Sequence, residues 1–410
     1  MPKAIRIATV TALAAAVAAF LGWYGNRHDF FDLRIYVSAM RWWADGHPLY
    51  EYAQPDRVQG ELYFTYPPFA AALLRPLAEI PMGATITIFL IGTAVAIGIT
   101  TWWLVTPVAL RHRQPPWFAA GLAIPLVFAI EPTRETFTFG QINMLLVLLI
   151  LGDLLLLVTR NSRWAGVGVG LATALKLYPG IFIVYLLATR RWRAAITASA
   201  TAAGATLLAA ALAPRDSWQF WTHELWATDR VGRTDYTGNQ SLLGLIGRAA
   251  IPDEPSRLVW LGLVALIAVY GLRRAAQAAR GGDEVAGLAL AGLVGALVSP
   301  IAWTHHVYWY VPAFVVLVDA ALRERDLRPR LALLGVAAVG YLVLLRGVVS
   351  FDDWGIAPLP TDTVGEFLRR NAYALLALVL IAVLPVRTGV LDYRRRGAKW
   401  TDLPTHARVG

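Results

Sequence analysis

The chain has 410 residues, of which 57% are hydrophobic and only 16% are charged, and its mean hydropathy is +0.52. This composition excludes an ordinary soluble globular protein and is typical of an integral membrane protein. The sequence contains no cysteine, so disulfide bonds, thiolate metal sites and cysteine nucleophiles are also excluded.

Apolar segments with helical potential recur from near the N-terminus to residue 388. A helix of about 20 apolar residues spans a bilayer, and about twelve spans are expected here. They lie at residues 4–23, 84–107, 117–130, 142–158, 164–178, 180–189, 194–213, 257–272, 285–302, 307–322, 331–349 and 371–388. We therefore predict an all-α polytopic membrane protein in which residues 1–410 form a single transmembrane domain. The first segment could instead be a cleaved signal peptide, but no soluble sequence follows it, which favours a retained helix.

Basic clusters alternate with these segments and predict the loops that face the cytoplasm. They lie at Arg111/Arg113, Arg160/Arg163, residues 190–193, Arg273/Arg274, residues 323–330 and residues 394–396. This topology predicts a multi-pass protein of the plasma membrane with both termini in the cytoplasm. The outer loops, at residues 24–83, 131–141, 214–256 and 350–370, would form a cap over an active site. Because the basic excess follows this orientation, the net charge of +10 requires no nucleic-acid partner.

The segment "HDFFDLRIYVSAMRWW", residues 28–43, carries two acidic residues beside aromatic ones. Its apolar residues follow helical spacing from Asp32 onward, which predicts an amphipathic helix in the outer interface. As an N-cap, Asp32 would stabilise this helix by about 1 kcal/mol, and as a general base it would accept a proton from a hydroxyl group. The two roles are compatible, because a helix N-terminus keeps a carboxylate ionised. Asp29 competes from a less defined position.

Lys176 is the only lysine between Lys3 and Lys399, and it lies at the outer end of a short apolar segment. It either extends toward lipid headgroups or binds the phosphate of an anionic lipid. His305 and His306 also lie at an outer helix end, among tryptophans and tyrosines. They are either interfacial anchors or hydrogen-bonding partners of a phosphate or a sugar hydroxyl. A metal site is not expected there, because adjacent side chains point apart and the other histidines are scattered.

Amides, arginines and aromatic rings gather in the same outer loops and supply further candidate site residues. These are Tyr66, Arg134, Gln141, Asn143, Asn239, Gln240, Arg248 and Trp303. Amides can simply cap helices, but beside aromatic rings they also suit a sugar, which presents hydroxyl groups and an apolar face. Tyr66 lies in "YFTYPPF", which can also be a purely structural turn before a helix.

The sequence contains no P-loop, no dinucleotide-binding glycine fingerprint and no Gly-x-Ser-x-Gly motif. An enzyme of this kind would most simply use a donor already dissolved in the membrane. The alternative class is a secondary transporter or lipid flippase, for which ionisable groups near the bilayer midplane and two related halves are expected. Those features are mostly missing, and the polar residues at outer helix ends favour an enzyme.

Several blocks together resemble glycosyltransferase family 87, whose members have the C-type glycosyltransferase fold. The blocks are "DLRIYV", "FTYPPFAA", "FGQINMLL", "ALKLYPGIFIVYLLATRRWRAA", "GNQSLLGLIGR" and "SPIAWTHHVYW". Within this family, the blocks resemble the α-1,2-mannosyltransferases of mycobacterial phosphatidylinositol mannoside synthesis. It implies transfer of mannose from polyprenyl phosphomannose to a glycolipid or lipoglycan on the outer face, with inversion and without a metal or another cofactor. Transfer of arabinose or another sugar from a polyprenyl phosphate is the alternative.

The resemblance also implies roles for particular residues. Asp32 matches the family's general base, and Lys176 matches the basic residue of a Lys-x-x-Pro pattern near the donor phosphate. The "THH" block corresponds to a segment with an active-site histidine, for which His306 is slightly favoured over His305. Arg134 or Arg248 would add positive charge near the phosphate, and membrane lipids, the polyprenyl donor and a glycolipid acceptor are the expected partners.

Overall fold

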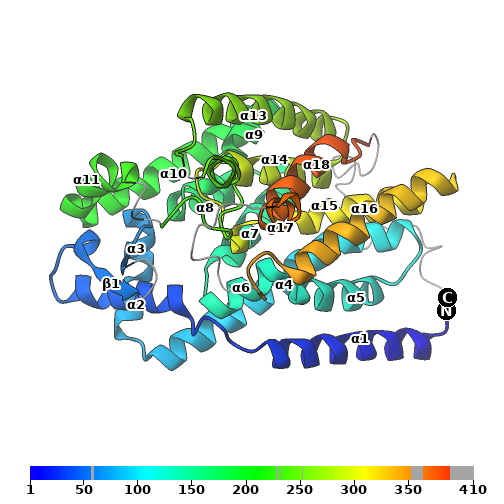
Figure 1. The fold of residues 1–410 in the computed structure, drawn as a ribbon, viewed down its shortest axis with the longest axis horizontal. Coiled ribbons are helices and arrows are strands. Elements are labelled where there is room, and N and C mark those ends of the chain that lie inside the picture. Colours follow the sequence, from blue (N-terminus) through cyan, green and yellow to red (C-terminus); the bar gives the residue numbers. More distant parts are fainter. Residues whose placement is uncertain (57–59, 228–229, 231, 252, 352–362, 388–410) are drawn as a thin grey trace.

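The computed structural model describes residues 1–410 except 57–59, 228–229, 231, 252, 352–362 and 388–410. The described part is built almost entirely of helices (Figure 1). It also contains an antiparallel hairpin of β1 (Ala53–Asp56) and β2 (Gly60–Tyr63), an element that the all-α prediction did not include. The basic cluster at 394–396 and much of the predicted loop 350–370 lie outside the described residues.

Five of the described helices are long and apolar enough to cross a membrane, and the protein is a membrane protein. These are α1 (Lys3–Tyr24), α4 (Met82–Arg111), α10 (Trp192–Leu212), α13 (Arg257–Arg280) and α16 (Leu327–Arg346). A sixth span arises if α5 (Pro116–Ala129) and α6 (Glu131–Phe139), bent by 65° at their junction, count as one. Every predicted segment contains a helix, but most are too short to span alone, so twelve crossings are not confirmed.

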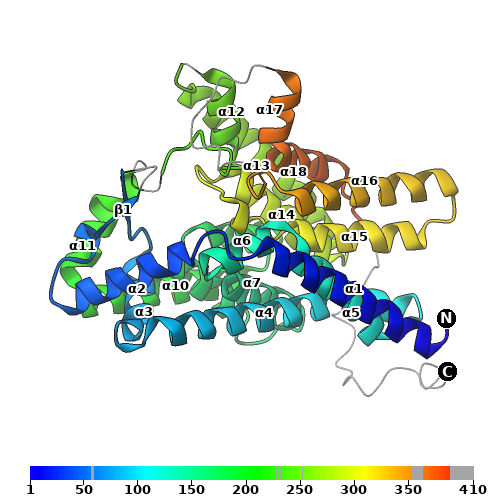
Figure 2. The ribbon, with the colours of Figure 1, turned by 60° about the horizontal axis from the view of Figure 1, so that its bottom comes forward.

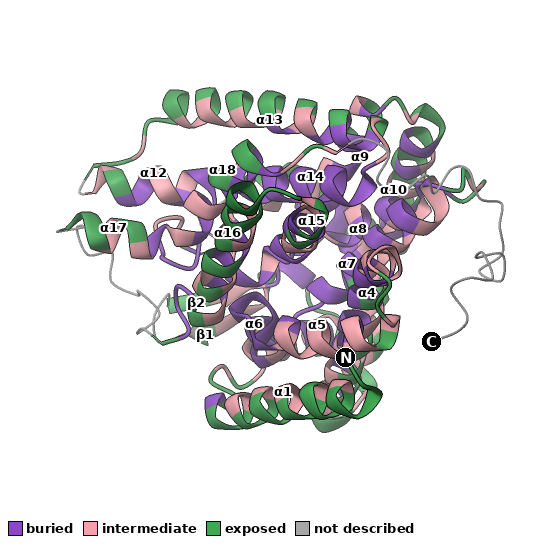
Figure 3. Cartoon of the chain, turned by 90° about the vertical axis from the view of Figure 1, so that its right-hand side faces the viewer, coloured by how far each residue is buried: buried purple, intermediate pink, exposed green. Residues whose placement is uncertain are grey.

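The shorter helices fill the spaces between the long ones. They are α7 (Asn143–Gly152) with its continuation η3 (Asp153–Val158), α8 (Val167–Leu175), η4 (Tyr178–Gly180), α9 (Ile181–Ala188), α14 (Glu284–Val298), α15 (Tyr310–Arg323) and α18 (Ala372–Val383). Helix α14 is buried from Glu284 to Leu297, whereas α1 is mostly exposed (Figure 3). The glycines of α14 allow neighbouring residues to pack this closely, since a Cβ atom at Gly292 would stand 2.2 Å from the Trp309 ring.

A group of short helices and the hairpin gather away from the chain's N-terminus, which lies at the opposite end of the molecule (Figure 2). They are α2 (Phe31–Ala44), η1 (Leu49–Glu51), the hairpin, α3 (Pro68–Leu74), η2 (Arg75–Glu79), α11 (Pro214–Thr222) and η5 (Glu224–Trp226). Helices α12 (Leu242–Ala250) and α17 (Val364–Arg370) lie near each other at another edge. The turn η7 (Thr304–His306) packs against α6 and links α14 to α15.

Candidate active site

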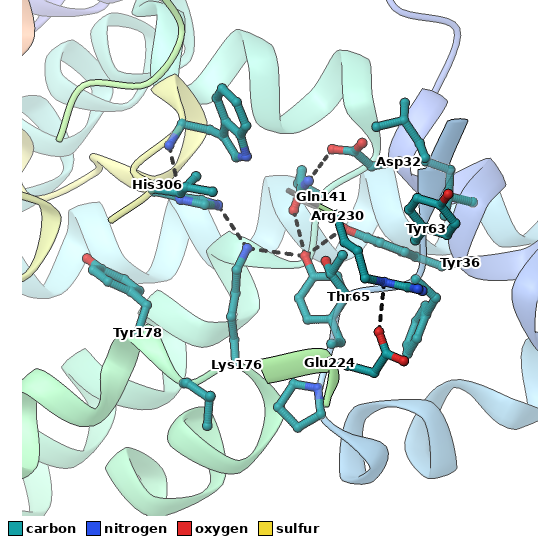
Figure 4. A pocket seen from close by; sticks show the side chains of 18 of the residues that line it. Asp32, Tyr36, Tyr63, Thr65, Gln141, Lys176, Tyr178, Glu224, Arg230 and His306 are labelled. Carbon is teal, nitrogen blue, oxygen red and sulfur yellow. Dashed lines mark hydrogen bonds and ion pairs between the residues drawn. The ribbon is translucent and has the colours of Figure 1, made fainter. Parts of the chain in front are cut away.

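A cavity of about 330 Å³ lies between the start of α2, the segment after β2, the end of α6, the junction of α8 with η4, and η7 (Figure 4). Segments far apart in the sequence therefore meet around one space. The sequence candidates that line it are Asp32, Tyr66, Gln141, Lys176, Trp303, His305 and His306. Asn143 lies just behind this lining and is hydrogen-bonded to it.

Asp32 lies at the cavity, in the first turn of α2, but it is not the N-cap. The helix begins at Phe31, and the preceding Phe30 takes the cap position with a φ of 54°. The predicted N-cap role of Asp32 is therefore wrong, because the cap lies two residues earlier, at Phe30. The Asp32 carboxylate instead accepts a hydrogen bond from the side-chain amide of Gln141.

Asp29 faces away from the buried lining of the site. Its side chain is 79% exposed and accepts a hydrogen bond from the Arg34 guanidinium at 2.9 Å. This outward ion pair leaves Asp32 as the carboxylate of the N-terminal loop region that lines the cavity.

Burial raises the pKa of Asp32 to about 6 from the usual 3.8. The hydrogen bond from Gln141 and, when it is charged, the Lys176 ammonium act in the opposite direction, but desolvation outweighs both. The helix N-terminus thus does not hold this pKa down as the sequence had led us to expect. At neutral pH the carboxylate is still mostly ionised, and its pKa is close to the range that suits a general base.

The raised pKa of Asp32 predicts an acidic limb in the pH profile of activity. Only the ionised carboxylate accepts a proton, and that form is lost as the pH falls through about 6. We expect the transfer rate to fall about tenfold per pH unit below this value. Initial rates measured from pH 4.5 to 8 would test this, since a rate unchanged down to about pH 4.5 would contradict it.

A continuous set of hydrogen bonds joins Asp32 to the other side of the cavity. The Gln141 amide donates to Asp32, and its Oε1 accepts from the Tyr66 hydroxyl at 3.2 Å. Oε1 also accepts from Asn143 Nδ2 at 3.3 Å. The Tyr66 hydroxyl lies 2.7 Å from that of Tyr36. The orientation of Gln141 is therefore fixed by the carboxylate at one end and by hydroxyl and amide donors at the other.

Lys176 lies at the other end of this hydrogen-bond network, where we expect the phosphate of the sugar donor to bind. It follows the last residue of α8, and its Nζ lies 3.1 Å from Asn143 Oδ1, 3.2 Å from the Tyr66 hydroxyl and 2.9 Å from His306 Nε2. Burial lowers the pKa of Lys176 to about 7, although the Asp32 charge opposes this shift. The side chain is thus turned into the protein and does not extend to lipid headgroups.

The two histidines have different surroundings within η7. His306 contacts Lys176, and its Nδ1 accepts a hydrogen bond from the Trp303 backbone N–H at 3.2 Å. His305 is 5% exposed, and neither of its ring nitrogens has a hydrogen-bond partner among the described residues. Its ring lies 5.5 Å from that of Phe139. Burial lowers the pKa of both imidazoles well below 6.5, so both are neutral in this state.

The structure does not bring Arg134 to the cavity. Its guanidinium is buried and donates to the carbonyl groups of Ala129 and Leu345 and to the Ser350 hydroxyl. The same group packs over the Tyr24 ring at 4.8 Å. Arg134 therefore connects α6 to the end of α16 and to α1. We no longer assign it to the binding of the donor phosphate.

Arg248, Asn239 and Gln240 also lie outside the cavity lining. Arg248 donates to the backbone carbonyl of Asn239 and to the side chain of Asn371. The Asn239 side chain donates to the Pro300 carbonyl and accepts from the Ala302 N–H at 2.9 Å. These side chains hold the backbone of the outer loops in place and do not reach into the cavity.

We expect Gln240→Leu to destabilise the protein. The buried Gln240 amide donates to the Thr237 and Arg370 carbonyls and accepts from the Tyr373 and Ala374 N–H groups. Leucine would leave these groups unpaired, at about 1–3 kcal/mol for each group that water cannot reach. Thermal unfolding in detergent would show a lower midpoint than wild type, while the KM values of the folded variant stay unchanged. A raised KM at unchanged stability would instead place Gln240 in substrate binding.

Sequence patterns did not single out Glu224, Arg230, Tyr36 and Tyr63, which also line the cavity. Arg230 Nε pairs with Glu224 at 2.8 Å, and its guanidinium lies 4.0 Å from the centre of the Tyr63 ring. Figure 4 shows Arg230 and Glu224 to the right of Lys176, on the side away from His306. Loop 214–256 offers no periodicity from which the pair could be found, and Tyr36 falls on the apolar face of its helix.

Comparison with known sequences defines the class of the protein. Residues 64–300, more than half of the chain, match the model of glycosyltransferase family 87. The chain therefore belongs to glycosyltransferase family 87, which confirms the resemblance in the sequence. No solved structure matches the chain significantly.

Curated relatives are similar along most of the chain. The polyprenol-phosphate-mannose-dependent alpha-(1-2)-phosphatidylinositol mannoside mannosyltransferase of Mycobacterium tuberculosis is 32% identical, over 96% of this chain and 94% of its own length. The protein of the same description from Mycolicibacterium smegmatis is 33% identical over 77% of this chain and 76% of its own length. The Mycolicibacterium smegmatis phosphatidylinositol pentamannoside mannosyltransferase is 30% identical, over 94% and 91%.

Proposed function

We propose that this glycosyltransferase moves mannose from polyprenyl phosphomannose to a phosphatidylinositol mannoside or a related glycolipid. The names of the relatives support the donor and the class of acceptor. The observation that carries the proposal is the pairing of a partly buried carboxylate with a partly buried amine across one cavity. Asp32 and Lys176 are linked there through Gln141 and Tyr66.

The chemistry follows as a single displacement. Asp32 takes the proton from an acceptor hydroxyl group. The oxygen of that hydroxyl group attacks the anomeric carbon of the donor, and the bond between this carbon and the phosphate oxygen breaks. Lys176 in its charged form and the Nε2–H of His306 stabilise the negative charge that develops on the leaving phosphate. A β-linked donor then gives an α-mannoside. No second carboxylate is needed, since no covalent sugar intermediate forms, and we propose that the reaction proceeds without a metal ion.

The two ends of the cavity are assigned to the two substrates. The donor phosphate occupies the end formed by Lys176 and His306. The acceptor headgroup enters from the end formed by Arg230, Glu224 and Tyr63, because an inverting attack needs the hydroxyl opposite the leaving phosphate. A charged pair beside a tyrosine ring suits a polyhydroxylated sugar.

We place this cavity on the outer face of the plasma membrane, with both termini in the cytoplasm. The positive-inside distribution of arginines supports this orientation. The position of the chain's N-terminus, at the opposite end of the molecule from α2, α11 and the hairpin, agrees with it (Figure 2). The segments that cover the cavity come from loops 24–83, 131–141 and 214–256.

The test is product analysis on the purified protein with defined donors. Polyprenyl phosphates carrying mannose, glucose or arabinose are each incubated with a phosphatidylinositol mannoside, and the products are identified by mass spectrometry. We expect one added hexose from the mannose donor and no product from the arabinose donor. If only the arabinose donor gave a product, with one added pentose, the protein would be an arabinosyltransferase and the proposed mannose transfer would be wrong.

A further inference from the structure

The hydrogen bonds around Lys176 determine its charge in the ligand-free site. The chain of donors and acceptors starts at Asp32, whose carboxylate can only accept in its ionised form. It therefore takes the amide NH₂ of Gln141, and Gln141 Oε1 faces the donors of Tyr66 and Asn143. Asn143 must then present its Oδ1 to Lys176, and the Tyr66 oxygen has its own proton directed to Gln141. Both groups accept hydrogen bonds from Lys176 Nζ.

The third contact of Lys176 is with His306, and it has the opposite direction. His306 Nδ1 accepts the backbone N–H of Trp303, so this nitrogen holds a lone pair. A neutral imidazole carries its proton on one nitrogen, which here is Nε2. Nε2–H points at Lys176 Nζ at 2.9 Å. A charged Lys176 ammonium has no lone pair, so its N–H would face the Nε2–H of His306, donor against donor. A neutral amine instead donates to Asn143 and Tyr66 and accepts from His306.

We propose that Lys176 is an uncharged amine in the ligand-free site, and that binding of the donor phosphate is coupled to the uptake of one proton by Lys176. This inference rests on the proposed function and refines the role of Lys176 in it. The phosphate oxygens would accept from both the new ammonium and the Nε2–H of His306, which turns from the amine to the phosphate. Lys176 then has three acceptors for its three protons, and no donor is left unpaired.

The groups that face Lys176 are consistent with this proton count. Asp32 on α2 is the one carboxylate with a resolved electrostatic effect on it. The other titratable groups near it are the hydroxyl groups of Tyr66 and Tyr36, the phenol ring of Tyr178 and the imidazoles of His305 and His306. Burial raises the pKa of Tyr66 and Tyr36 and lowers that of both histidines. All four are thus neutral at neutral pH, and the lowered pKa of Lys176, about 7, lies where uptake is measurable.

The experiment is calorimetric titration of the full-length protein with polyprenyl phosphomannose in the absence of acceptor. The donor is a phosphodiester, whose own charge does not change between pH 6 and 9. Titrations at pH 8 in HEPES and in Tris differ in the heat of buffer ionisation, and this difference gives the number of protons bound. About nine-tenths of an amine with a pKa near 7 is uncharged at pH 8, so we expect uptake close to one proton per donor, and much less at pH 6.

Three variants assign the proton. Lys176→Met should bind the donor without uptake, and its affinity deficit relative to wild type should shrink about tenfold per pH unit above 7. Asp32→Asn should retain uptake, which separates Lys176 from the other titrating group of the site. Lys176→Arg, with a permanent charge, should bind without uptake. Donor binding with no buffer dependence in wild type, or undiminished uptake in Lys176→Met, would overturn the proposal. A wild-type protein that binds no donor would contradict the proposed function instead.

Discussion

Asp32→Asn is expected to lower the rate of mannosyl transfer by about 10²- to 10⁴-fold, the contribution typical of a general base. Asparagine has nearly the same shape as aspartate, so the contact with Gln141 is kept in part, but the amide cannot take the acceptor proton. Donor affinity and thermal stability should therefore change little. Initial rates with saturating donor and acceptor, together with calorimetric donor binding, measure both parts of this expectation.

The matched control is Asp29→Asn. Asp29 lies three residues earlier, is exposed and pairs with Arg34 outside the cavity. Its positive φ of 47° is one that asparagine also tolerates. This variant should transfer mannose at close to the wild-type rate. A loss of activity in Asp29→Asn with full activity in Asp32→Asn would reverse our assignment of the two acids.

Lys176→Met is expected to lower kcat/KM for the donor by about 10²- to 10³-fold at pH 6.5, where most of the wild-type lysine is charged. Methionine fills a similar volume but leaves the developing phosphate charge with only the hydrogen bond from His306. The KM for the acceptor should be nearly unchanged, because Lys176 lies at the other end of the cavity from Arg230 and Glu224. Varying each substrate at a fixed concentration of the other separates the two effects.

Arg230→Gln is the contrasting variant at the acceptor end. It removes the ion pair with Glu224 and should raise the KM for the acceptor while leaving the donor KM near the wild-type value. If both variants changed the donor and acceptor constants alike, the assignment of opposite ends of the cavity to the two substrates would fail.

The helices of this membrane protein could be predicted from the sequence, because apolar runs are a direct record of burial in lipid or protein. The number of helices that cross the bilayer could not be predicted from the sequence. Short helices such as α14 are buried by neighbouring helices, and hydropathy does not distinguish protein from lipid as the apolar surroundings. The β1–β2 hairpin was missed because each strand has only four residues.

The sequence also indicated residues that the structure brings to one cavity. Asp32, Lys176 and His306 come from distant segments, and the family resemblance gave each of them a role in the site. The structure brings all three to one cavity. Their ionisation was not predictable, since burial dominates the pKa of Asp32 and Lys176 and burial depends on the fold.

Arginines and amides were the residues whose roles could not be separated from sequence. Arg248 and Gln240 are as polar as Gln141, and all three lie in or beside outer loops. Only their hydrogen-bond partners distinguish them. Gln240 bonds to backbone groups, Arg248 bonds to backbone carbonyls and to the Asn371 side chain, and Gln141 bonds to Asp32 in the cavity. A buried side chain whose partners all lie away from a cavity holds a loop in place, whereas one that faces a cavity can exchange a protein partner for a ligand.

The most direct test of the proposed reaction is the configuration of its product. Purified protein is incubated with β-linked polyprenyl phosphomannose and a phosphatidylinositol mannoside, and the new linkage is identified by NMR. We predict one new α-mannosyl linkage with the wild type and none in the same time with Asp32→Asn. A β-linked product, or equal amounts of product from both proteins, would contradict an inverting transfer with Asp32 as its base.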